Sequence, residues 1–403
     1  MDKREKIYLN IPDFVSEIID RISASGEKAY LVGGSLRDML LSKAPHDFDV
    51  ASSVSPEKIC DIFCDMRVIK TGIAHGTVTL LSSGGPVEIT TFRVDGAYTD
   101  MRHPESVTFT RRIEDDLARR DFTVNAMAYN REDLLIDLFD GASDLKNKII
   151  KTVGKPEERF GEDALRIMRA FRFSAQLGFE IDIETLKAAE RMRFGLERIA
   201  RERIFSELIK LITSEEPKAA LMLMQKADVL KTILPQYTVS ERAISLLSRV
   251  PNNDIARLSA LFCDSEPSKI REMLSSLKAS NRQKRVALIV EESRKAYSSR
   301  YDVAKLKARL SDDVEIALLL SVLLGFSCDG ALSYLEDKTP YSISQLAIDG
   351  AELGALGLCG REIGEMLSYL LEKVMEEPSF NEKNILLNLA KNKLTKTKND
   401  REE

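Results

Sequence analysis

The sequence predicts an α+β protein, with a small mixed α/β domain at the N-terminus and an all-α remainder. The chain has 403 residues, which at ~100–200 residues per domain corresponds to two to four domains. Short β-branched runs between turn residues occur within residues 1–147, whereas apolar residues recur with the helical period of 3.6 from Pro156 onward. A composition of 44% hydrophobic and 31% charged residues indicates a folded globular protein rather than a disordered or fibrous one.

Each element of the N-terminal part follows from a local pattern. Amphipathic periodicity predicts helices over Ile11–Ser25, from Pro56 and from Asp115, and a short helix Ser35–Ser42 follows a pair of glycines. Alternating or β-branched runs predict strands at Ala29–Val32, Asp47–Ala51, Val68–Ile73, Thr77–Leu81, Val87–Phe92 and Leu134–Phe139. The turn at Ser82–Pro86 makes a hairpin of the fourth and fifth strands, and the polar segment Val94–Pro104 is predicted to be a long loop.

The helical part is interrupted by Gly and Pro at intervals but contains no internal repeat of 20–50 residues. We therefore predict four parts along the chain: a head over residues 1–147, a helical neck over 148–213, a helical body over 214–310 and a helical tail over 311–403.

Secretory and membrane-spanning classes are disfavoured. The first ten residues are charged and no apolar stretch follows them, unlike a secretory signal. The longest apolar run, Ile316–Phe326, has eleven residues, whereas a spanning helix needs ~20. The five cysteines do not form a disulfide framework, and Cys60 and Cys64 lack the partners of a zinc site. We expect a cytoplasmic protein without membrane contact.

The charge is unevenly distributed along the chain. The formal net charge is −5, but residues 268–310 contain twelve Lys and Arg against four Asp and Glu, a local excess of eight positive charges. Such a block can be an ordinary solvated helical face, or the place where a nucleic-acid backbone lies. The block alone does not decide between these two interpretations.

A phosphate cradle is predicted at residues 31–38, which read LVGGSLRD. A strand that runs into two glycines and then a helix N-terminus brings main-chain N–H groups and the positive end of a helix dipole toward an anion. The two glycines allow the close approach, Gly34 is the one predicted to bind the nucleotide, and Arg37 can add a forked donor to a phosphate oxygen.

Paired carboxylates follow the cradle. Asp47 and Asp49 are two positions apart on a predicted strand, so both side chains point to one face while Phe48 points to the other. Two adjacent anions repel each other unless cations join them, and hard oxygen ligands suit Mg²⁺. Glu88, in the middle of another strand, is the candidate third carboxylate.

Asp163 and Arg166 have the i,i+3 spacing that places an acceptor and a forked donor on one face of a predicted helix. Cytosine and adenine both offer an exocyclic amino donor beside a ring-nitrogen acceptor, whereas uracil and guanine present the opposite polarity. The pair could therefore accept C and A and reject U and G without a nucleic-acid template. The alternative is an ordinary helix ion pair. Arg169 and Arg172 continue the row and could reach a triphosphate.

Residues 33–38 together with Asp47 and Asp49 resemble the head of the polymerase-β-type nucleotidyltransferases. Further blocks resemble, in order and spacing, the motifs of the tRNA nucleotidyltransferase and bacterial poly(A) polymerase family, the class II CCA-adding enzymes: residues 119–125, 137–144, 162–166 and 201–207. The resemblance covers residues 28–210, about half of the chain, and beyond it only length and helical character match.

The resemblance implies a template-independent enzyme that adds and repairs the 3′-terminal CCA of tRNA with CTP and ATP, and releases pyrophosphate. It implies that Asp47 and Asp49 hold two Mg²⁺ ions and that Glu88 is a candidate general base. It also assigns the second motif, with Arg120, Asp121 and Asn125, to ribose recognition, and assigns Asp163, Arg166, Arg169 and Arg172 to the nucleotide site. Body and tail would grip the tRNA by shape and phosphates.

Several alternatives stay open. Within the class they are a tRNA A-adding enzyme working beside a CC-adding partner, and a poly(A) polymerase. From other classes they are a non-catalytic RNA-binding protein, disfavoured by the retained Asp47, Asp49 and Arg166, and a small-molecule nucleotidyltransferase, which has no need of the Asp163–Arg166 pair. A monomer and a homodimer are equally compatible with the sequence.

Overall fold

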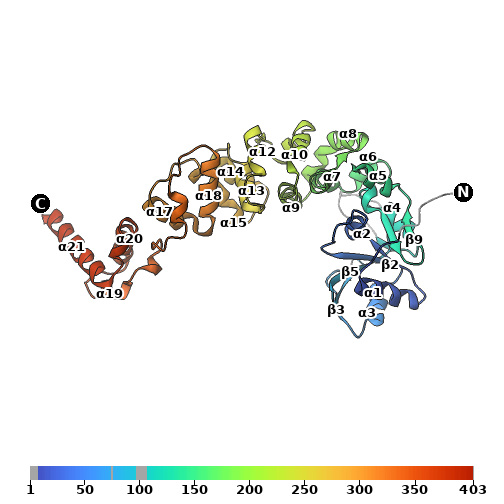
Figure 1. Cartoon of the computed structure of the whole chain (residues 1–403), viewed down its shortest axis with the longest axis horizontal. Coiled ribbons are helices and arrows are strands. Elements are labelled where there is room, and N and C mark those ends of the chain that lie inside the picture. The colour runs from blue at the N-terminus through green and yellow to red at the C-terminus, as the bar shows by residue number, and fades with distance from the viewer. Residues whose placement is uncertain (1–7, 74–75, 97–106, 403) are drawn as a thin grey trace. The chain divides into compact units, whose positions relative to one another are not determined.

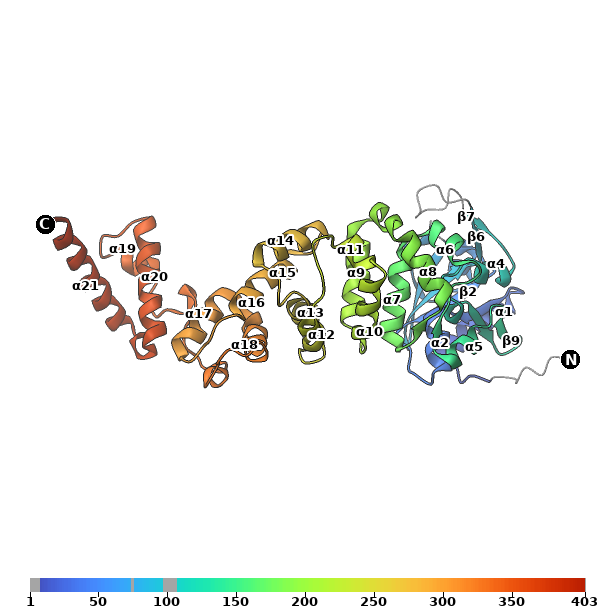
Figure 2. The same ribbon diagram turned by 90° about the horizontal axis from the view of Figure 1, so that it is seen from above.

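The chain is described from a computed structural model, which covers residues 8–73, 76–96 and 107–402. It divides into two compact units, Met1–Val239 and Ser240–Glu403, hereafter unit 1 and unit 2 (Figures 1 and 2). A sheet-containing head followed by helices confirms the predicted α+β class. The four-part boundaries are not tested by this division and stay a prediction.

Unit 1 is built on a seven-stranded sheet with the strand order β3-β4-β5-β2-β1-β8-β9. Neighbouring strands are antiparallel except β2 and β5, which run parallel. The strands are β1 (Ala29–Val32), β2 (Phe48–Ser52), β3 (Arg67–Ile69), β4 (Thr77–Ser82), β5 (Gly85–Thr91), β8 (Met127–Asn130) and β9 (Leu134–Asp137). A separate ribbon pairs β6 (Arg93–Asp95) with β7 (Val107–Phe109). Residues 97–104 of the predicted loop lie outside the described residues.

The two faces of the sheet are covered by different elements. The ring of Phe14, on α1 (Asp13–Ala24), packs edge-on against Phe48 at 5.3 Å between ring centroids, so α1 covers the face to which Phe48 points. On the other face, Tyr30 and Ala51 belong to a buried cluster that includes side chains of α4 (Ile113–Ala118). Side chains alternate along a strand, and this places Asp49 on the same face as that cluster.

The fold differs from the predicted elements at several places. Val94 and Asp95, expected at the start of the long loop, belong to strand β6, and its partner β7 was not predicted. Strand β8, in the middle of the sheet beside β1, was not predicted, because its four residues contain no β-branched side chain to indicate a strand. Two strands of two residues each, β10 (Ile149–Ile150) and β11 (Glu180–Ile181), pair with each other in the neck, which was expected to be all helical. The remaining head helices are α2 (Gly33–Leu40), α3 (Pro56–Ile62) and α5 (Gly141–Asn147), with the 3₁₀ turn η2 (Thr123–Asn125).

The helices that follow the sheet in unit 1 carry the second half of the site. They are α6 (Pro156–Glu162), α7 (Leu165–Leu177), α8 (Ile183–Met192), α9 (Arg201–Ile212), α10 (Pro217–Lys226) and α11 (Val229–Ile233), with the 3₁₀ segment η3 (Arg193–Arg198). Helix α7 packs against α9 and α10 and buries most of its residues. Arg166 and Arg169 in its N-terminal half bond to Arg119 and Asp121 of the head.

Unit 2 is helical throughout its described residues. Its helices are α12 (Glu241–Leu247), α13 (Asp254–Leu261), α14 (Pro267–Ser276), α15 (Asn281–Lys284), α16 (Val286–Glu292), α17 (Arg300–Leu310), α18 (Val314–Leu323), α19 (Gly350–Gly354), α20 (Arg361–Glu376) and α21 (Lys383–Glu402). A separate apolar cluster, centred on Leu353, Leu370 and Leu386, joins α19, α20 and α21. Among the described residues, no helix combines the length and the apolar character that a membrane crossing requires.

Candidate active site

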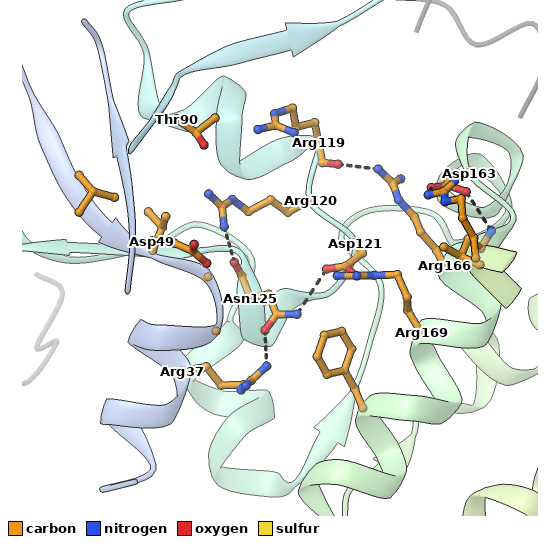
Figure 3. A pocket seen from close by; sticks show the side chains of 17 residues that line it. Arg37, Asp49, Thr90, Arg119, Arg120, Asp121, Asn125, Asp163, Arg166 and Arg169 are labelled. Carbon is orange, nitrogen blue, oxygen red and sulfur yellow. Dashed lines mark hydrogen bonds and ion pairs between the residues drawn. The ribbon is translucent and has the colours of Figure 1, made fainter. Parts of the chain in front are cut away.

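A pocket of about 420 Å³ lies where the head meets the neck helices within unit 1 (Figure 3). From the sheet and α2 it is lined by Val32, Gly33, Gly34, Arg37, Asp49, Val50 and Thr90. From the segment after α4 and from the neck it is lined by Arg119, Arg120, Asp121, Asn125, Asp163, Leu165, Arg166, Arg169, Phe173 and Arg203. Of the predicted site residues, Asp47, Glu88 and Arg172 are not part of this lining.

The cradle at the N-terminus of α2 needs glycine at position 33. Gly33 has a φ of +68°, in the left-handed region, and a Cβ atom there would lie 3.1 Å from an Asp49 carboxylate oxygen and 3.3 Å from Arg120. A Cβ at Gly34 would meet only Arg37, at 3.6 Å. Both glycines line the pocket, and of the two Gly33 is the one whose position leaves no room for a side chain.

The three predicted carboxylates belong to neighbouring positions of the sheet. Asp49 on β2 pairs in register with Glu88 on β5, so the two side chains share one face, and Asp47 precedes β2 by one residue. Burial, followed by the charges of Asp47 and Glu88, raises the pKa of Asp49 to about 6. Among the described residues, however, no three His, Cys, Asp or Glu side chains are arranged to hold a metal by themselves.

A chain of hydrogen bonds connects α2 to α7 across the floor of the pocket (Figure 3). Arg37 donates to the side-chain oxygen of Asn125 at 2.9 Å, and Asn125 donates to Asp121 at 3.4 Å. Asp121 in turn accepts from Arg169 at 2.7 Å and from the Phe122 main-chain N–H. Burial acts to raise the pKa of Asp121, but Arg169, Arg166 and the Phe122 N–H together outweigh it, and the pKa lies below the usual value. We call these four side chains the Arg37–Arg169 chain.

The local structure around Asp163 and Arg166 is not the one predicted. The two residues were expected on one face of a continuous helix, but the helix breaks between α6 and α7, and Asp163 has an extended backbone with φ −140°. The carboxylate of Asp163 accepts from the Leu165 N–H at the start of α7. Both side chains nevertheless line the pocket: Asp163 lies in the break between α6 and α7, and Arg166 is the second residue of α7.

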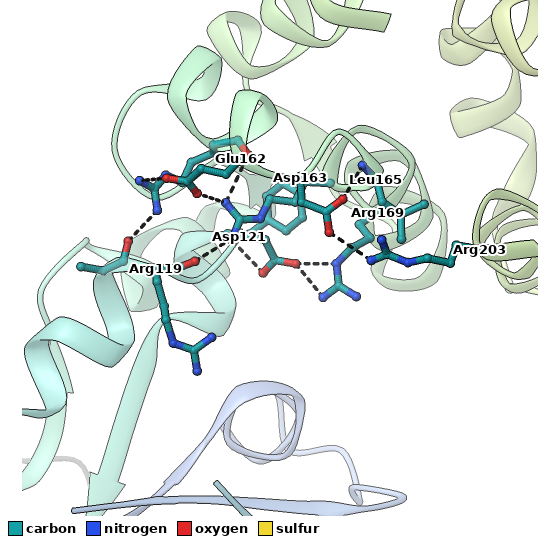
Figure 4. A network of polar contacts seen from close by, with 11 residues as sticks. Arg119, Asp121, Glu162, Asp163, Leu165, Arg169 and Arg203 are labelled. Atoms are coloured by element: carbon teal, nitrogen blue, oxygen red, sulfur yellow. Dashed lines mark hydrogen bonds and ion pairs between the residues drawn. The ribbon is translucent and has the colours of Figure 1, made fainter. Parts of the chain in front are cut away.

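The side chains of Asp163 and Arg166 pair with other residues, and the two positions are joined only through the main chain, by the Arg166 N–H and the Asp163 carbonyl at 3.0 Å. Figure 4 shows the pairing of Asp163 with Arg203. Asp163 accepts from Arg203 on α9 at 3.1 Å. Arg166 donates to Glu162 at 2.5 Å and to the main-chain carbonyls of Arg159 and Arg119. The alternative interpretation, an ordinary ion pair between the side chains of Asp163 and Arg166 on one helix, is therefore wrong, and both side chains line the pocket.

Arg172 lies behind the pocket. Its guanidinium pairs with the buried carboxylate of Glu207 on α9 at 3.1 Å and lies 4.1 Å from the centre of the Phe173 ring. Burial lowers the pKa of Arg172 to about 10. The structure thus brings Arg37 and Arg169 to the pocket and leaves Arg172 in a supporting position.

Sequence reasoning did not single out Phe173 and Arg203. The Phe173 ring has the guanidinium carbons of Arg37 and Arg169 at 5.4 and 5.3 Å from its centre, and its edge packs against Phe122. No spacing rule connects Phe173 to Arg37 or Arg203 to Asp163, because these contacts join elements far apart in the chain. The block 201–207 was a signal for Arg203, whereas Phe173 lies in no block and only the three-dimensional arrangement identifies it.

Comparison with known proteins gives consistent matches. Residues 29–151 match the poly A polymerase head domain, and residues 178–240 match the probable RNA- and SrmB-binding site of polymerase A. The CCA-adding enzyme of Ligilactobacillus salivarius is 37% identical, over 96% of this chain and 98% of its own length. The CCA-adding enzyme of Streptococcus thermophilus is 50% identical over 51% of this chain and 50% of its own length.

Among solved structures, the crystal structure of the Bacillus stearothermophilus CCA-adding enzyme in complex with CTP is similar, with a TM-score of 0.79 and 28% identity. The similarity covers 96% of this chain and 98% of that one. The matches therefore extend beyond residue 210, where the recognisable motifs of this sequence end.

Proposed function

Because the chain belongs to the family of CCA-adding enzymes, which are tRNA nucleotidyltransferases, we propose that it builds and repairs the 3′-terminal CCA of tRNA from CTP and ATP. The observation that carries the proposal is the single pocket in which the Gly33–Gly34 cradle and Asp49 face Asp163 and Arg166. An enzyme for small-molecule substrates needs the first pair of features but not the second.

In the proposed reaction the 3′-hydroxyl oxygen of the tRNA attacks the α-phosphorus of the bound nucleotide. A new O–P bond forms, the bond between the α-phosphorus and its bridging oxygen breaks, and pyrophosphate leaves with the displaced electron pair. The hydroxyl proton is removed in this step, and Glu88 is the candidate acceptor because it lies beside Asp49 on the neighbouring strand. For the triphosphate we propose the main-chain N–H groups at the start of α2 together with Arg37. We add Arg120, which the family resemblance assigns to ribose recognition, because its guanidinium lies beside Gly33 at the cradle.

Magnesium fits the carboxylate end of the pocket. Burial is the main cause of the raised pKa of Asp49, and the negative charges of Asp47 and Glu88 add to it, so a cation would be attracted there. Mg²⁺ is usually held by one or two carboxylates together with water and substrate phosphates, so a ready-made group of three ligands is not required. We assign Asp47 and Asp49 as the ligands of two Mg²⁺ ions. When bound, Mg²⁺ would lower the pKa of the attacking hydroxyl and neutralise the leaving pyrophosphate.

Asp163 and Arg166 keep enough hydrogen-bonding capacity to read a base. The Asp163 carboxylate has about four lone-pair sites, and protein donors use one on each oxygen. Arg166 has five N–H groups, three of which are used by Arg159, Glu162 and Arg119. An acceptor for the exocyclic amino group and a donor for the ring nitrogen therefore remain, as selection of C and A requires.

The basic block of unit 2 separates into two groups. Eight of its twelve Lys and Arg side chains pair with carboxylates or main-chain carbonyls inside the unit: Arg271, Arg285, Arg294, Lys295, Arg300, Lys305, Lys307 and Arg309. Within the described chain, Lys269, Lys278, Arg282 and Lys284 have no ion pair and no side-chain hydrogen bond. Three of these four, Lys278, Arg282 and Lys284, form the corner between α14 and α15, in a stretch (275–290) without Asp or Glu.

We assign this α14–α15 corner (Lys278, Arg282 and Lys284) to contact with tRNA phosphates, because its charges are not used by the fold. The eight paired residues are assigned to the structure of unit 2. Arg285, for example, donates to the Leu310 carbonyl at 2.7 Å and thereby ties the start of α16 to the end of α17.

Single-nucleotide incorporation tests the proposed function. Three tRNA transcripts, ending before CCA, before CA and before A, are each incubated with one NTP at a time. We expect CTP to extend the first two and ATP only the third. Extension of the third transcript alone would indicate an A-adding enzyme, repeated addition of AMP to any RNA would indicate a poly(A) polymerase, and no extension with tRNA still bound would indicate a non-catalytic RNA-binding protein.

A further inference from the structure

Asp116 on α4 is a buried carboxylate whose side chain is held only by arginines of the pocket. The residue is 1% exposed. A buried charge is costly unless it is paired and hydrogen-bonded, so its partners indicate why it is tolerated. Burial acts to raise the pKa of Asp116, but Arg120 and Arg119 outweigh it, and the pKa lies below the usual value.

The carboxylate divides its two oxygens between two consecutive arginines. One oxygen accepts from Nε and a terminal nitrogen of Arg119, at 3.0 and 2.6 Å. The other accepts from Nε and a terminal nitrogen of Arg120, at 3.3 and 3.0 Å. Each guanidinium therefore donates through the edge formed by Nε and one terminal nitrogen, and these two bonds fix the plane of the group as well as its position.

Both arginines line the pocket, and each connects to a different part of it. Arg120 also donates to the Asn125 carbonyl at 3.2 Å and lies beside Gly33, at the phosphate cradle. The main-chain carbonyl of Arg119 accepts from Arg166 at 2.9 Å, at the base-reading end. One carboxylate outside the pocket thus fixes a side chain at the cradle and the residue on which Arg166 is anchored.

We propose that Asp116 is a positioning residue, which holds the Arg119 and Arg120 guanidiniums in the orientation needed to bind the nucleotide triphosphate. The proposal rests on the proposed function of the pocket. Two arginines and one aspartate leave one positive charge in excess, so the clamp keeps the site attractive to phosphate while preventing the two guanidiniums from moving apart. The alternative is that Asp116 only stabilises the fold, without effect on the nucleotide.

The experiment compares Asp116→Asn with Asp115→Asn in the full chain. Asp115 is the preceding residue of α4, half-buried and hydrogen-bonded to Thr110 instead, so its substitution makes the same change in charge and size. With tRNA saturating, we expect kcat/KM for both CTP and ATP to fall roughly 10- to 100-fold in Asp116→Asn. The Kd for tRNA should not change, and Asp115→Asn should behave as the parent chain.

A double-mutant cycle separates positioning from simple stabilisation. In a chain that already carries Arg119→Ala and Arg120→Ala, adding Asp116→Asn should change single-turnover kcat/KM less than about two-fold, because the groups through which Asp116 acts are gone. An undiminished effect in that background, or a lowered melting temperature with unchanged kcat/KM in the single variant, overturns the proposal. If Asp116→Asn does not fold, Asp116→Glu replaces it, because it keeps the charge and displaces the carboxylate by one methylene.

The double-mutant cycle can be interpreted whether the enzyme adds CCA, a single A or poly(A). If the nucleotide-incorporation experiment fails but CTP or ATP still binds, the Kd for the nucleotide takes the place of kcat/KM in the comparison. Failure of the clamp and failure of the proposed function therefore give different results.

Discussion

Asp163 combines a structural contact with the predicted reading of the base. Its carboxylate accepts the Leu165 N–H at the start of α7 and pairs with Arg203. Loss of the side chain must therefore cost stability even if the residue never meets a nucleotide. A measurement of activity alone cannot separate these two contributions, whereas a measurement of base preference can.

We predict that Asp163→Ala weakens discrimination between C and U and between A and G. A bidentate contact to a base contributes ~1–3 kcal/mol to discrimination, so the preference for CTP over UTP in kcat/KM should fall by roughly one to two powers of ten. Asp182→Ala is the matched control, because Asp182 caps α8 through the Glu184 and Thr185 N–H groups and does not line the pocket. It should lower the melting temperature and leave base choice intact. An active Asp163→Ala enzyme that still rejects UTP as strongly as the parent would contradict the prediction.

A second prediction for single residues concerns the assigned magnesium ligand Asp49. Asp49→Ala should abolish nucleotide transfer and leave the Kd for tRNA within a few-fold, because two carboxylates are the ligands that Mg²⁺ is expected to use here. Chelation with EDTA should stop the parent enzyme in the same way, and added Mg²⁺ should restore it. Transfer near the normal rate in Asp49→Ala would refute the assignment of the ligands.

At the scale of elements, the α14–α15 corner can be tested against an equally charged control. The variant Lys278→Ala/Arg282→Ala/Lys284→Ala removes three unpaired charges, and Arg271→Ala/Arg300→Ala/Lys305→Ala removes three that are paired within unit 2. The first should flatten the dependence of log Kd for tRNA on log salt by about one unit for each phosphate that is no longer neutralised. The KM for ATP should not change. Equal slopes for the two triple variants would show that only net charge matters.

The packing of α5 against η2 can be tested by substitution of two glycines, Gly141 and Gly161. A Cβ at Gly141 would collide with the Thr123 carbonyl oxygen, so Gly141→Ala should push α5 away from η2, the turn that carries Asn125. We expect a loss of ~1–3 kcal/mol in unfolding free energy from this overpacking. Gly161 on α6 is the control, since a Cβ there would meet only Met192 at 3.8 Å. Thermal unfolding of Gly161→Ala should show no loss of stability, and a comparable loss in both variants would exclude this explanation.

Local patterns were sufficient for most elements of the head but not for the contacts between them. The strand Ala29–Val32 and the hairpin of β4 and β5 were predictable, because turn residues bound them on both sides. Strand β8 was not, since its pairing with β1 rather than its own residues makes it a strand. Among the pocket residues, Arg37, Asp121 and Arg166 were predictable from motifs. Arg203 lies in the block 201–207 but was not singled out, and Phe173 lies in no block; both reach the pocket through packing of α9 and α7.

At the scale of the whole chain, both units contain buried carboxylates whose ionised form is stabilised in the folded protein. Asp116 and Asp121 in unit 1 and Glu292 in unit 2 have lowered pKa values; in each, burial acts in the opposite direction and charged or hydrogen-bonding partners outweigh it. A lowered pKa in the folded state contributes stability above the unfolded pKa, and this stability disappears as the pH falls through the folded value.

We therefore predict that both units lose stability in the range below about pH 4.5, the ordinary pKa of Glu292. Thermal unfolding between pH 7 and pH 3 should show melting temperatures that are steady near neutrality and fall steeply in acid. Glu292→Gln should lower the melting temperature at pH 7 and make its fall in acid less steep. An acid response identical to that of the parent would show that Glu292 does not contribute.

The Arg37–Arg169 chain has a consequence for how such a protein can evolve. Head and neck are separate stretches of sequence, yet two of the four side chains at the floor of the pocket follow α4, one precedes β2 and one belongs to α7. A gene fusion that exchanged the first 147 codons for those of a distant relative would take the positions of Arg37, Asp121 and Asn125 from that relative. Arg169 would still come from this protein and would have to pair with them. Recombination at that boundary is thus restricted to donors whose side chains match at these positions, and head and neck are inherited as one module.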